Sequence, residues 1–171
     1  MSDKSVTLRY FAQSADAALL LTEPALESML RYQQLRLKDK EAGGQLFARF
    51  QGPEAIIVEA TRPKKLDRRT RCSFRPNQWL QRCEIKNRYA RALHFVGDWH
   101  THPEATPSPS HDDIAGMQEC FRRSKHDLNA FVLVILGTDP PPEGLYVVLV
   151  HGDGFQRLRC QLGGLVTPNC L

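Results

Sequence analysis

The segment 97–113, GDWHTHPEATPSPSHDD, concentrates side chains that can bind a metal ion. His100 and His102 stand two positions apart at the end of an apolar run, 93–99, that is typical of a buried strand. Alternate side chains of a strand point to the same side, so both imidazoles can face one metal ion. Pro103 ends the strand immediately after them.

A carboxylate follows at the start of the next expected helix. Ser110 is a good N-cap residue, and it places Asp113 in the first helical turn, where the carboxylate can turn back toward the histidines. Asp112 lies in the same turn and is the alternative ligand. Two imidazoles and one carboxylate suit zinc and leave a fourth tetrahedral position for water, as in catalytic zinc sites. Zinc lowers the pKa of such a water to about 7.

A catalytic zinc site also needs a base that takes a proton from the water and passes it to the leaving amine. Glu41 is the candidate, because it lies just before the strand-like run 45–50. The intervening Gly43 and Gly44 let the backbone pass close to the metal pocket.

The remaining sequence must supply the elements that position these residues. Apolar runs and turn residues predict strands, and periodic apolar residues between caps predict helices. The first helix begins at Thr22 and continues through Leu37 to about Gly43. The expected strands are 6–11, 18–21, 45–50, 55–61, 93–99, 130–137, 145–150 and 155–161, and the other two expected helices are 76–91 and 110–125.

The composition fits one globular domain. The chain has 171 residues, of which 42% are hydrophobic and 25% charged, enough for a sizeable core. Its five cysteines form no C-x-x-C pair and follow no signal peptide, so we expect reduced thiols in a cytoplasmic protein. The apolar runs are far shorter than the roughly 18 residues that span a bilayer, so we expect no membrane segment.

The charge is unevenly distributed. The net charge of +4 is too small to indicate a nucleic-acid binder. Residues 62–91, however, contain eleven Lys and Arg residues and two acids, a local net charge of +9. Its most basic part, 62–75, is typical of a solvated loop, and we expect it to contact an acidic partner surface. Charge reversal at Arg68 and Arg69 is then predicted to raise KM at low salt.

The distant Glu41, the His-x-His-Pro of residues 100–103 and the Ser-x-x-Asp of residues 110–113 together resemble the JAMM (MPN+, JAB-domain) zinc metalloproteases. The Gly-Gly-x-Leu after Glu41 is also frequent in that family. A closer resemblance is to the small deconjugating isopeptidases of bacterial CBASS anti-phage operons. It rests on Gly-Asp-Trp-His-Thr-His-Pro-Glu, the preceding His94-Phe95-Val96, Asp67-Arg68-Arg69 and Ser124-Lys125-His126.

This resemblance implies a role for each candidate residue. His100, His102 and Asp113 would hold zinc, Glu41 would be the general acid and base, and the Ser110 hydroxyl would stabilise the oxyanion of the tetrahedral intermediate. The reaction would be hydrolysis, by a zinc-activated water, of the amide bond that joins the C-terminus of a conjugated protein to its target. In the CBASS relatives the conjugated protein is a cGAS-like nucleotidyltransferase.

The resemblance also implies the fold. We expect an α/β (α+β) single-domain, cytidine-deaminase-like architecture, in which a mixed, largely antiparallel sheet has helices on both faces. The domain is expected to span residues 1–162, with 163–171 as a C-terminal tail.

Other functions fit parts of the pattern. A processing protease for a bacterial ubiquitin-like protein would have an identical site. A RadC-like protein with a nucleic-acid role is a weaker alternative that rests on the basic segment. The intact set of Glu41, His100, His102, Ser110 and Asp113 argues against an inactive MPN scaffold. Zinc deaminases carry His-x-Glu and Pro-Cys-x-x-Cys, which this chain lacks. The expected partner is a protein substrate conjugated through its C-terminus. We expect no membrane partner, and a nucleic acid is the less favoured alternative.

Overall fold

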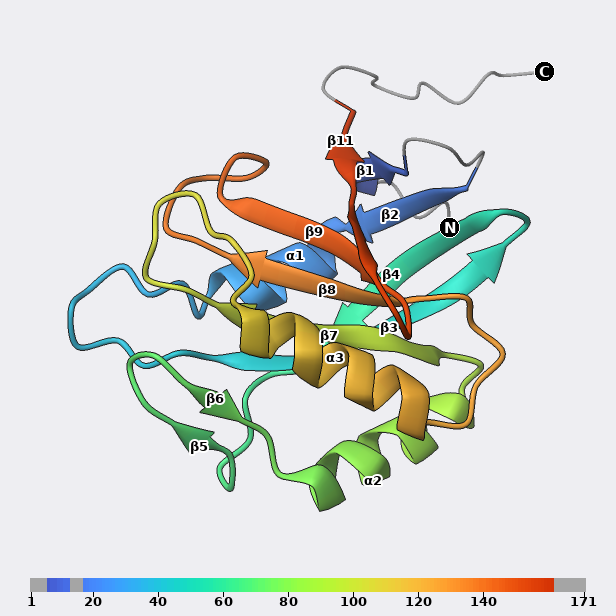
Figure 1. Ribbon diagram of the computed structural model, residues 1–171, viewed down its shortest axis with the longest axis horizontal. Helices are drawn as coiled ribbons and strands as arrows, with labels where there is room; N and C mark the ends of the chain where they lie inside the picture. The colour runs from blue at the N-terminus through green and yellow to red at the C-terminus, as the bar shows by residue number, and fades with distance from the viewer. Residues whose placement is uncertain (1–5, 13–16, 162–171) are drawn as a thin grey trace.

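The computed structural model describes residues 6–12 and 17–161, and nine of its strands form one sheet (Figure 1). Across the sheet the order is β10-β9-β8-β7-β3-β4-β2-β1-β11. Two neighbouring pairs, β2 with β4 and β7 with β8, are parallel, and the others are antiparallel. The strands are β1 (Val6–Phe11), β2 (Ala18–Thr22), β3 (Gly43–Gln51), β4 (Glu54–Ala60), β7 (His94–Thr101), β8 (Phe131–Leu136), β9 (Leu145–Val150), β10 (Phe155–Arg157) and β11 (Arg159–Cys160).

Three helices cover the two faces of this sheet, as Figure 1 shows. Helix α1 (Glu23–Leu30) packs on one face, and α2 (Gln78–Tyr89) and α3 (His111–Arg123) lie on the other. The predicted mixed, largely antiparallel sheet with helices on both faces is confirmed. None of the described helices is long and apolar enough to cross a bilayer, since the longest, α3, has 13 residues.

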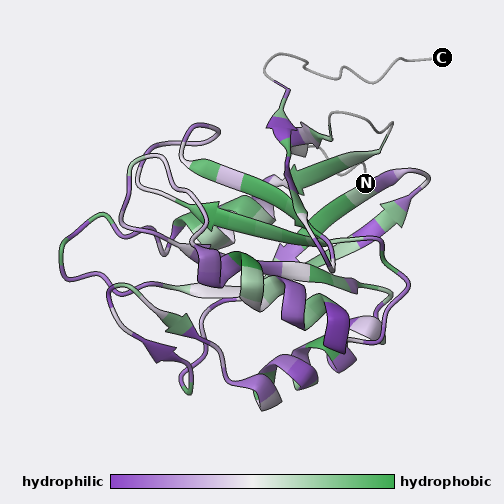
Figure 2. Ribbon diagram, viewed as in Figure 1, coloured by the Kyte–Doolittle hydropathy of each residue, from purple (hydrophilic) through white to green (hydrophobic). Residues whose placement is uncertain are grey.

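Strand β8 shows why this sequence forms a two-sided core. All six of its residues are buried, because both of its faces are covered. Phe131, Leu133 and Ile135 pack in the cluster under α3, whereas the alternate residues, Val132, Val134 and Leu136, pack in the cluster under α1. Figure 2 shows this apolar centre in green and the outer faces of α2 and α3 largely in purple.

Helix α3 connects the parallel strands β7 and β8, so these three elements form a β-α-β unit. In such units the loop after the first strand leads to the N-terminus of the helix at one edge of the sheet. Residues 102–110 connect β7 to α3 and therefore bring the end of β7, which we call the His strand, close to the first turn of α3.

The prediction that the first helix continues to about Gly43 is wrong. Helix α1 ends at Leu30, and residues 31–42 form turns. Leu37, which fitted the helical period, is 80% exposed, because the apolar stripe of the helix is already complete at Leu30. Gln34 is instead buried, and its side-chain amide donates hydrogen bonds to the carbonyls of Asp39 and Arg71.

The basic segment is more ordered than the expected loop. It contains a short antiparallel hairpin of β5 (Arg68–Arg69) and β6 (Phe74–Arg75). We call residues 62–77 the hairpin insertion. Helix α2 follows it and is capped by Asn77, whose side chain accepts a hydrogen bond from the Leu80 N–H at 3.1 Å. The expected tail, 163–171, lies outside the described residues, so the boundary at residue 162 stays a prediction.

Candidate metal centre

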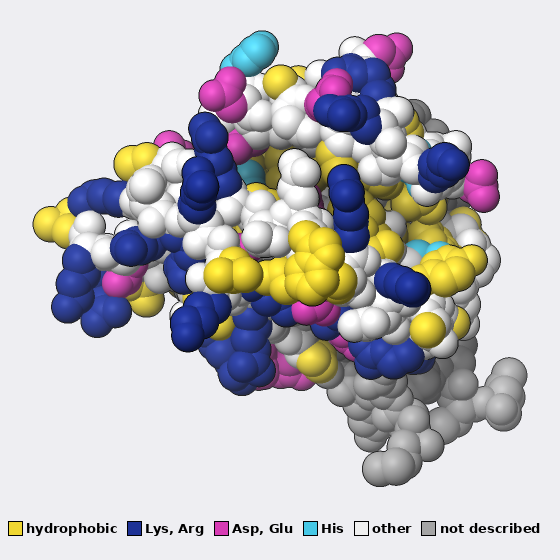
Figure 3. Space-filling model, turned by 90° about the horizontal axis from the view of Figure 1, so that it is seen from below, with side chains coloured by type: hydrophobic (Ala, Val, Ile, Leu, Met, Phe, Trp, Pro, Cys, Tyr) yellow, Lys and Arg dark blue, Asp and Glu magenta, His cyan; other side chains and the backbone are white. Residues whose placement is uncertain are grey.

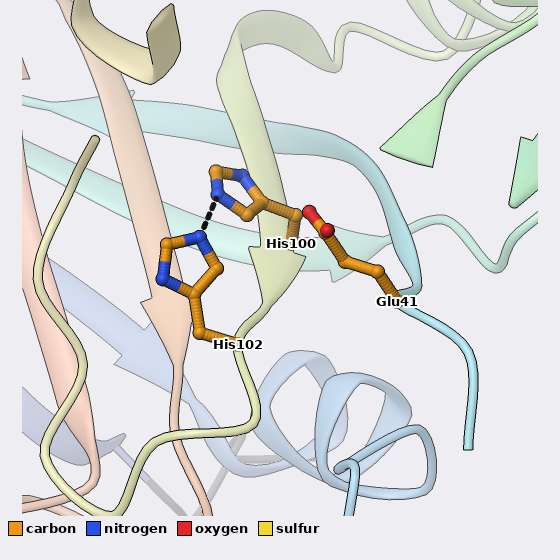
Figure 4. Close-up of side chains that lie close together, drawn as sticks. All are labelled: Glu41, His100 and His102. Carbon is orange, nitrogen blue, oxygen red and sulfur yellow. Dashed lines mark hydrogen bonds between the residues drawn. The ribbon is translucent and has the colours of Figure 1, made fainter. Parts of the chain in front are cut away.

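The two histidines of the HxH motif meet at the end of β7 (Figure 4). His100 is the penultimate residue of the strand, and His102 follows its end. Their Nε2 atoms are 3.1 Å apart, and both rings are largely shielded from solvent. The His102 N–H donates to the Leu136 carbonyl of β8 at 2.8 Å, so the pairing of the two strands continues past the end of β7 and orients the second ring.

Asp113 turns back toward this pair from the first turn of α3. Its carboxylate oxygens lie 3.3 Å from Nε2 of His100 and 3.5 Å from Nε2 of His102. A reciprocal capping box fixes it: the Asp113 N–H donates to Ser110 Oγ at 3.1 Å, and the Ser110 N–H donates to the Asp113 carboxylate at 2.7 Å. The neighbouring Asp112 carboxylate is fully exposed and faces His111.

Glu41 reaches the same place from the segment before β3. It is buried, and its carboxylate is turned toward the His100 ring (Figure 4). Ligand atoms of Glu41, His100 and His102 all lie within 4.8 Å of one another. The first two residues of β3, Gly43 and Gly44, bring Glu41 to this place, because Gly43 pairs with His100 in the β3–β7 ladder.

Neither glycine has room for a side chain. A Cβ on Gly43 would lie 2.5 Å from the Phe74 ring, and one on Gly44 would lie 2.2 Å from the Thr61 carbonyl oxygen. The backbone therefore passes so close to Phe74 and Thr61 at these two residues that only glycine fits there.

The hairpin insertion makes hydrogen bonds to the backbone N–H and carbonyl of Glu41. The Glu41 N–H donates to the Thr70 carbonyl at 2.8 Å, and the Glu41 carbonyl accepts from Nε of Arg69 at 2.7 Å. Arg69 also donates to the Lys40 carbonyl, whereas its neighbour Arg68 is exposed. The two arginines that the sequence treated alike thus differ: Arg69 supports the Glu41 segment, and Arg68 faces solvent.

A buried polar network, which sequence reasoning missed, links Glu41 to the His strand. Thr101, fully buried between the two histidines, accepts at Oγ1 from the Ala42 N–H at 3.0 Å and donates to Oε1 of Gln34 at 3.0 Å. Its own N–H donates to the Ala42 carbonyl at 2.8 Å. No local pattern marks this network, because Gln34 and Thr101 are 67 residues apart and both are ordinary surface residue types.

The pKa values of the two carboxylates of the site are shifted in opposite directions. Burial raises the pKa of Glu41 above its ordinary value, although the histidines oppose this shift. Burial alone would also raise the pKa of Asp113, but hydrogen bonds from His100 and His102 hold it far below its usual range. Asp113 in turn keeps the pKa of His102 raised against the effect of burial. Asp113 is thus the carboxylate that stays ionised to lower pH, and Glu41 is the one that takes up a proton more readily.

The donor set fits a zinc ion. Two imidazole nitrogens only 3.1 Å apart, with an ionised carboxylate 3.3 to 3.5 Å from both, leave lone pairs converging on one small region. A cation satisfies such a cluster, and a set of histidine nitrogens and carboxylate oxygens is one that zinc commonly takes.

Comparison with protein-family models matches residues 23–151 to the prokaryotic homologues of the JAB domain. The chain belongs to this JAB-domain family. The matched range runs from α1 to the end of β9, and it contains all five candidate residues. The resemblance that the motifs indicated is confirmed.

Curated relatives of this JAB-domain protein agree with the match. It is 31% identical over 165 residues to a CD-NTase/cGAS isopeptidase of Enterobacter hormaechei, covering 93% of this chain and 89% of the relative. A protein of the same description in Pseudomonas aeruginosa is 29% identical, covering 90% of this chain and 89% of the relative. A probable metalloprotease of Sinorhizobium fredii is 29% identical, covering 70% of this chain and 76% of the relative.

A solved structure confirms the fold alone. A protein from Desulfitobacterium hafniense superposes with a TM-score of 0.59 at 21% identity, over 80% of this chain and 87% of that one. Family and relatives together identify the JAB-domain protein as an enzyme, a JAB-type isopeptidase or metalloprotease of the hydrolase class.

Proposed function

We propose that the protein is a zinc-dependent isopeptidase that cleaves the bond between the C-terminus of a conjugated protein and its target. The observation that carries the proposal is the convergence of His100, His102, Asp113 and Glu41 at the carboxyl end of β7. This set offers both a ligand cluster and a separate carboxylate for proton transfer.

We assign the roles by the electrostatics of each side chain. His100, His102 and the ionised Asp113 would hold zinc. When bound, zinc supplies Lewis acidity that makes water nucleophilic near neutral pH. The Glu41 carboxylate, whose pKa is raised by burial, takes the proton of the attacking water and donates it to the nitrogen of the leaving amine. The Ser110 hydroxyl, whose Oγ accepts from the Asp113 N–H, would donate its hydrogen to the carbonyl oxygen of the scissile bond.

The proposed substrate is a CD-NTase, a cGAS-like nucleotidyltransferase, conjugated through its C-terminus. The names of the Enterobacter and Pseudomonas relatives, which match over about nine-tenths of this chain, support this substrate. The alternative is a bacterial ubiquitin-like protein. We also propose a cytoplasmic location, because Cys72, Cys83, Cys120 and Cys160 are free thiols.

Two conjugates test this function. The C-terminal segment of a CD-NTase and that of a ubiquitin-like protein are each joined to the lysine of a reporter protein. The wild-type protein loaded with zinc is expected to cleave the CD-NTase conjugate, and a chelator is expected to stop the reaction until zinc is restored. Glu41→Gln is expected to bind zinc normally and to cleave at least about 100-fold more slowly, the usual cost of losing a general base.

Each other outcome changes a definite part of the proposal. If the enzyme cleaved only the ubiquitin-like conjugate, its substrate would be the ubiquitin-like protein and not the CD-NTase. A wild-type rate in Glu41→Gln would remove Glu41 from proton transfer. Failure of the zinc-loaded enzyme on both conjugates would reject the isopeptidase assignment.

A further inference from the structure

Two adjacent glutamines, Gln33 and Gln34, lie in the segment 31–42 between α1 and β3. Figure 3 views this segment and the hairpin insertion from below and shows many Lys and Arg side chains on their outer surface. The two glutamines instead make hydrogen bonds to other parts of the fold. Gln34 belongs to the network around Thr101 and also donates to the Arg71 carbonyl of the hairpin insertion. Gln33 makes its contacts on a different side of the metal centre.

Gln33 binds the backbone that follows β8. Its Nε2 atom donates to the Gly137 carbonyl at 2.8 Å and to the Asp139 carbonyl at 3.4 Å. We call residues 137–139 the β8 turn. A side-chain amide carries two N–H donors on one nitrogen, so it can bind two carbonyls at once. Gln33 therefore fixes the carbonyls on both sides of Thr138.

The β8 turn in turn holds the 102–110 loop, which connects the His strand to α3. The Thr138 N–H donates to the Glu104 carbonyl at 2.7 Å, and the Asp139 N–H donates to the Ala105 carbonyl at 3.1 Å. Within the described part of the chain, no other backbone hydrogen bond holds the interior of this loop. The loop is thus anchored between its ends by the same turn that Gln33 binds.

Zinc-ligand candidates lie at both ends of this loop. His102 begins it, and the capping box of Ser110 and Asp113 ends it. Three of the nine residues of the 102–110 loop are prolines, whose φ angles are fixed, so the loop is stiff. A displacement in its middle is therefore passed on to Asp113, and changes the distances from the Asp113 carboxylate to the two imidazoles.

Resting on the proposed function, we propose that Gln33 is a positioning residue of the metal centre. Through the β8 turn it holds the 102–110 loop where Asp113 completes the zinc site. The two adjacent glutamines then serve different carboxylates: Gln34 helps to position Glu41, and Gln33 helps to position Asp113. Without Gln33 the loop samples other positions in the metal-free protein, and the apparent zinc affinity falls by the fraction of molecules that are not ready to bind.

The zinc affinity of Gln33 variants tests this role without any substrate. Gln33→Met keeps the length of the side chain but removes the donor, and Gln33→Glu keeps its shape but replaces the donor by an acceptor. Both are expected to weaken zinc binding about tenfold, as is usual when a group that orients a metal ligand is lost. Gln33→Lys keeps a donor and is expected to stay within about threefold of the wild-type affinity. Competition with a chromogenic chelator measures each value.

Gln51→Met is the matched control. Gln51 is exposed at the end of β3, and its side chain makes no hydrogen bond to a described residue, so zinc affinity is expected to stay unchanged. Urea unfolding of the metal-free proteins checks that the Gln33 variants fold. Wild-type zinc affinity in Gln33→Met and Gln33→Glu would overturn the proposal. An equal loss in Gln33→Lys would also overturn it, because the hydrogen bonds would then not be the cause.

A comparison with Thr101→Val separates the two sides of the centre. Thr101 acts on Glu41, so its variant is expected to lose kcat and to keep its zinc affinity. Gln33→Met is expected to lose zinc affinity and, at saturating zinc, to keep kcat within about threefold of wild type, because bound zinc selects the competent position of the loop. A loss of kcat with normal zinc affinity in Gln33→Met would assign Gln33 to Glu41 and overturn the proposal.

Cleavage distinguishes a failure of this inference from a failure of the proposed function. Cleavage of neither conjugate by the wild type, with weakened zinc binding in Gln33→Met and Gln33→Glu, would leave the role of Gln33 standing and reject the isopeptidase. Cleavage of a conjugate, with normal zinc binding in both variants, would leave the isopeptidase standing and refute the role of Gln33. An unchanged zinc affinity in Asp113→Asn would refute the ligand set, and with it the route by which Gln33 acts.

Discussion

At the scale of single residues, the two carboxylates of the metal centre, Asp113 and Glu41, differ in their pKa because their surroundings differ. Asp113 receives hydrogen bonds from both histidines and stays ionised, whereas Glu41 is buried without a direct hydrogen bond to its carboxylate among the described residues. Environments that push two acids in opposite directions are the usual means of dividing a ligand role from an acid-base role. Two carboxylates beside one histidine pair thus differ in how readily they take up a proton, as the proposed division into a ligand and an acid-base residue requires.

The adjacent aspartates give a matched pair of variants. Asp113→Asn is expected to weaken zinc binding more than about 100-fold, because it removes the ionised carboxylate that lies 3.3 and 3.5 Å from the two ring nitrogens. Asp112→Asn is expected to leave zinc affinity unchanged, since its carboxylate is fully exposed. Competition with a chromogenic chelator measures both. A larger loss in Asp112→Asn would show that the ligand is the other aspartate.

Thr101 is expected to position Glu41 without touching substrate. Thr101→Val removes the hydroxyl that joins Ala42 to Gln34, so kcat is expected to fall about tenfold with KM and zinc affinity little changed. Thr101→Ser keeps the hydroxyl and is expected to restore most of the rate. If the serine variant were as slow as the valine variant, the hydrogen bonds would not be the cause.

At the scale of elements, the hairpin insertion is expected to have two separable roles, to position the Glu41 segment and to dock an acidic partner. Arg69→Ala is expected to lower kcat with little change in KM, because Arg69 holds the Glu41 and Lys40 carbonyls. Arg68→Ala is expected to raise KM at low salt with little change in kcat, because Arg68 faces solvent where an acidic partner would dock. Steady-state kinetics at two salt concentrations distinguish them. Equal effects on kcat in both variants would contradict this division.

A chain of ion pairs anchors α2 to the insertion and to β4. Glu84 pairs with Lys64 and Arg88, and Arg88 also reaches Glu59 at 2.8 Å. Partial burial alone would raise the pKa of Glu84, but these cations hold it below its ordinary value of 4.5. A lowered carboxyl pKa stabilises the fold above the unfolded pKa, and this contribution disappears as pH falls through the folded pKa.

Glu84→Gln is therefore expected to lower the free energy of unfolding by about 1 kcal/mol at pH 7 and to have a smaller effect near pH 3. Urea unfolding at the two pH values measures this difference. Glu119→Gln, whose ion pairs are half exposed, is the control and is expected to change little at either pH. A loss in Glu84→Gln that was as large at pH 3 as at pH 7 would mean that packing, and not charge, is responsible.

The elements also show what a sequence can and cannot reveal. The uninterrupted apolar run of β8, the alternating histidines and the Ser110–Asp113 cap are local signals, and each was predictable. The end of α1 at Leu30 was not, because Leu37 continues the helical period and only the finished core leaves it exposed. The Gln34–Thr101 network and the hydrogen bonds of Gln33 depend on contacts between distant segments, which no local pattern encodes.

At the scale of the whole molecule, the metal centre joins three regions of the chain: residue 41, residues 100–102 and residue 113. Zinc that binds only this assembled arrangement stabilises the fold by mass action. Zinc at 100 times its dissociation constant is expected to add about 2.7 kcal/mol, or roughly 5 to 10 °C in Tm for a chain of this size. Calorimetry of the metal-free and zinc-loaded protein measures the shift, and an equal shift in Asp113→Asn would place the bound zinc elsewhere.

The position of β7 between β3 and β8 also determines the order of events when the protein is made. The His strand is held on one side by residues 43–48 and on the other by residues 132–136, so its geometry is complete only after β8 has been added to the sheet. A nascent chain that has emerged only to residue 125 has every metal ligand but an unpaired edge where β8 belongs. We therefore expect a chain that is still being synthesised to bind the metal ion, and to gain hydrolytic activity, only after β8 has left the ribosome.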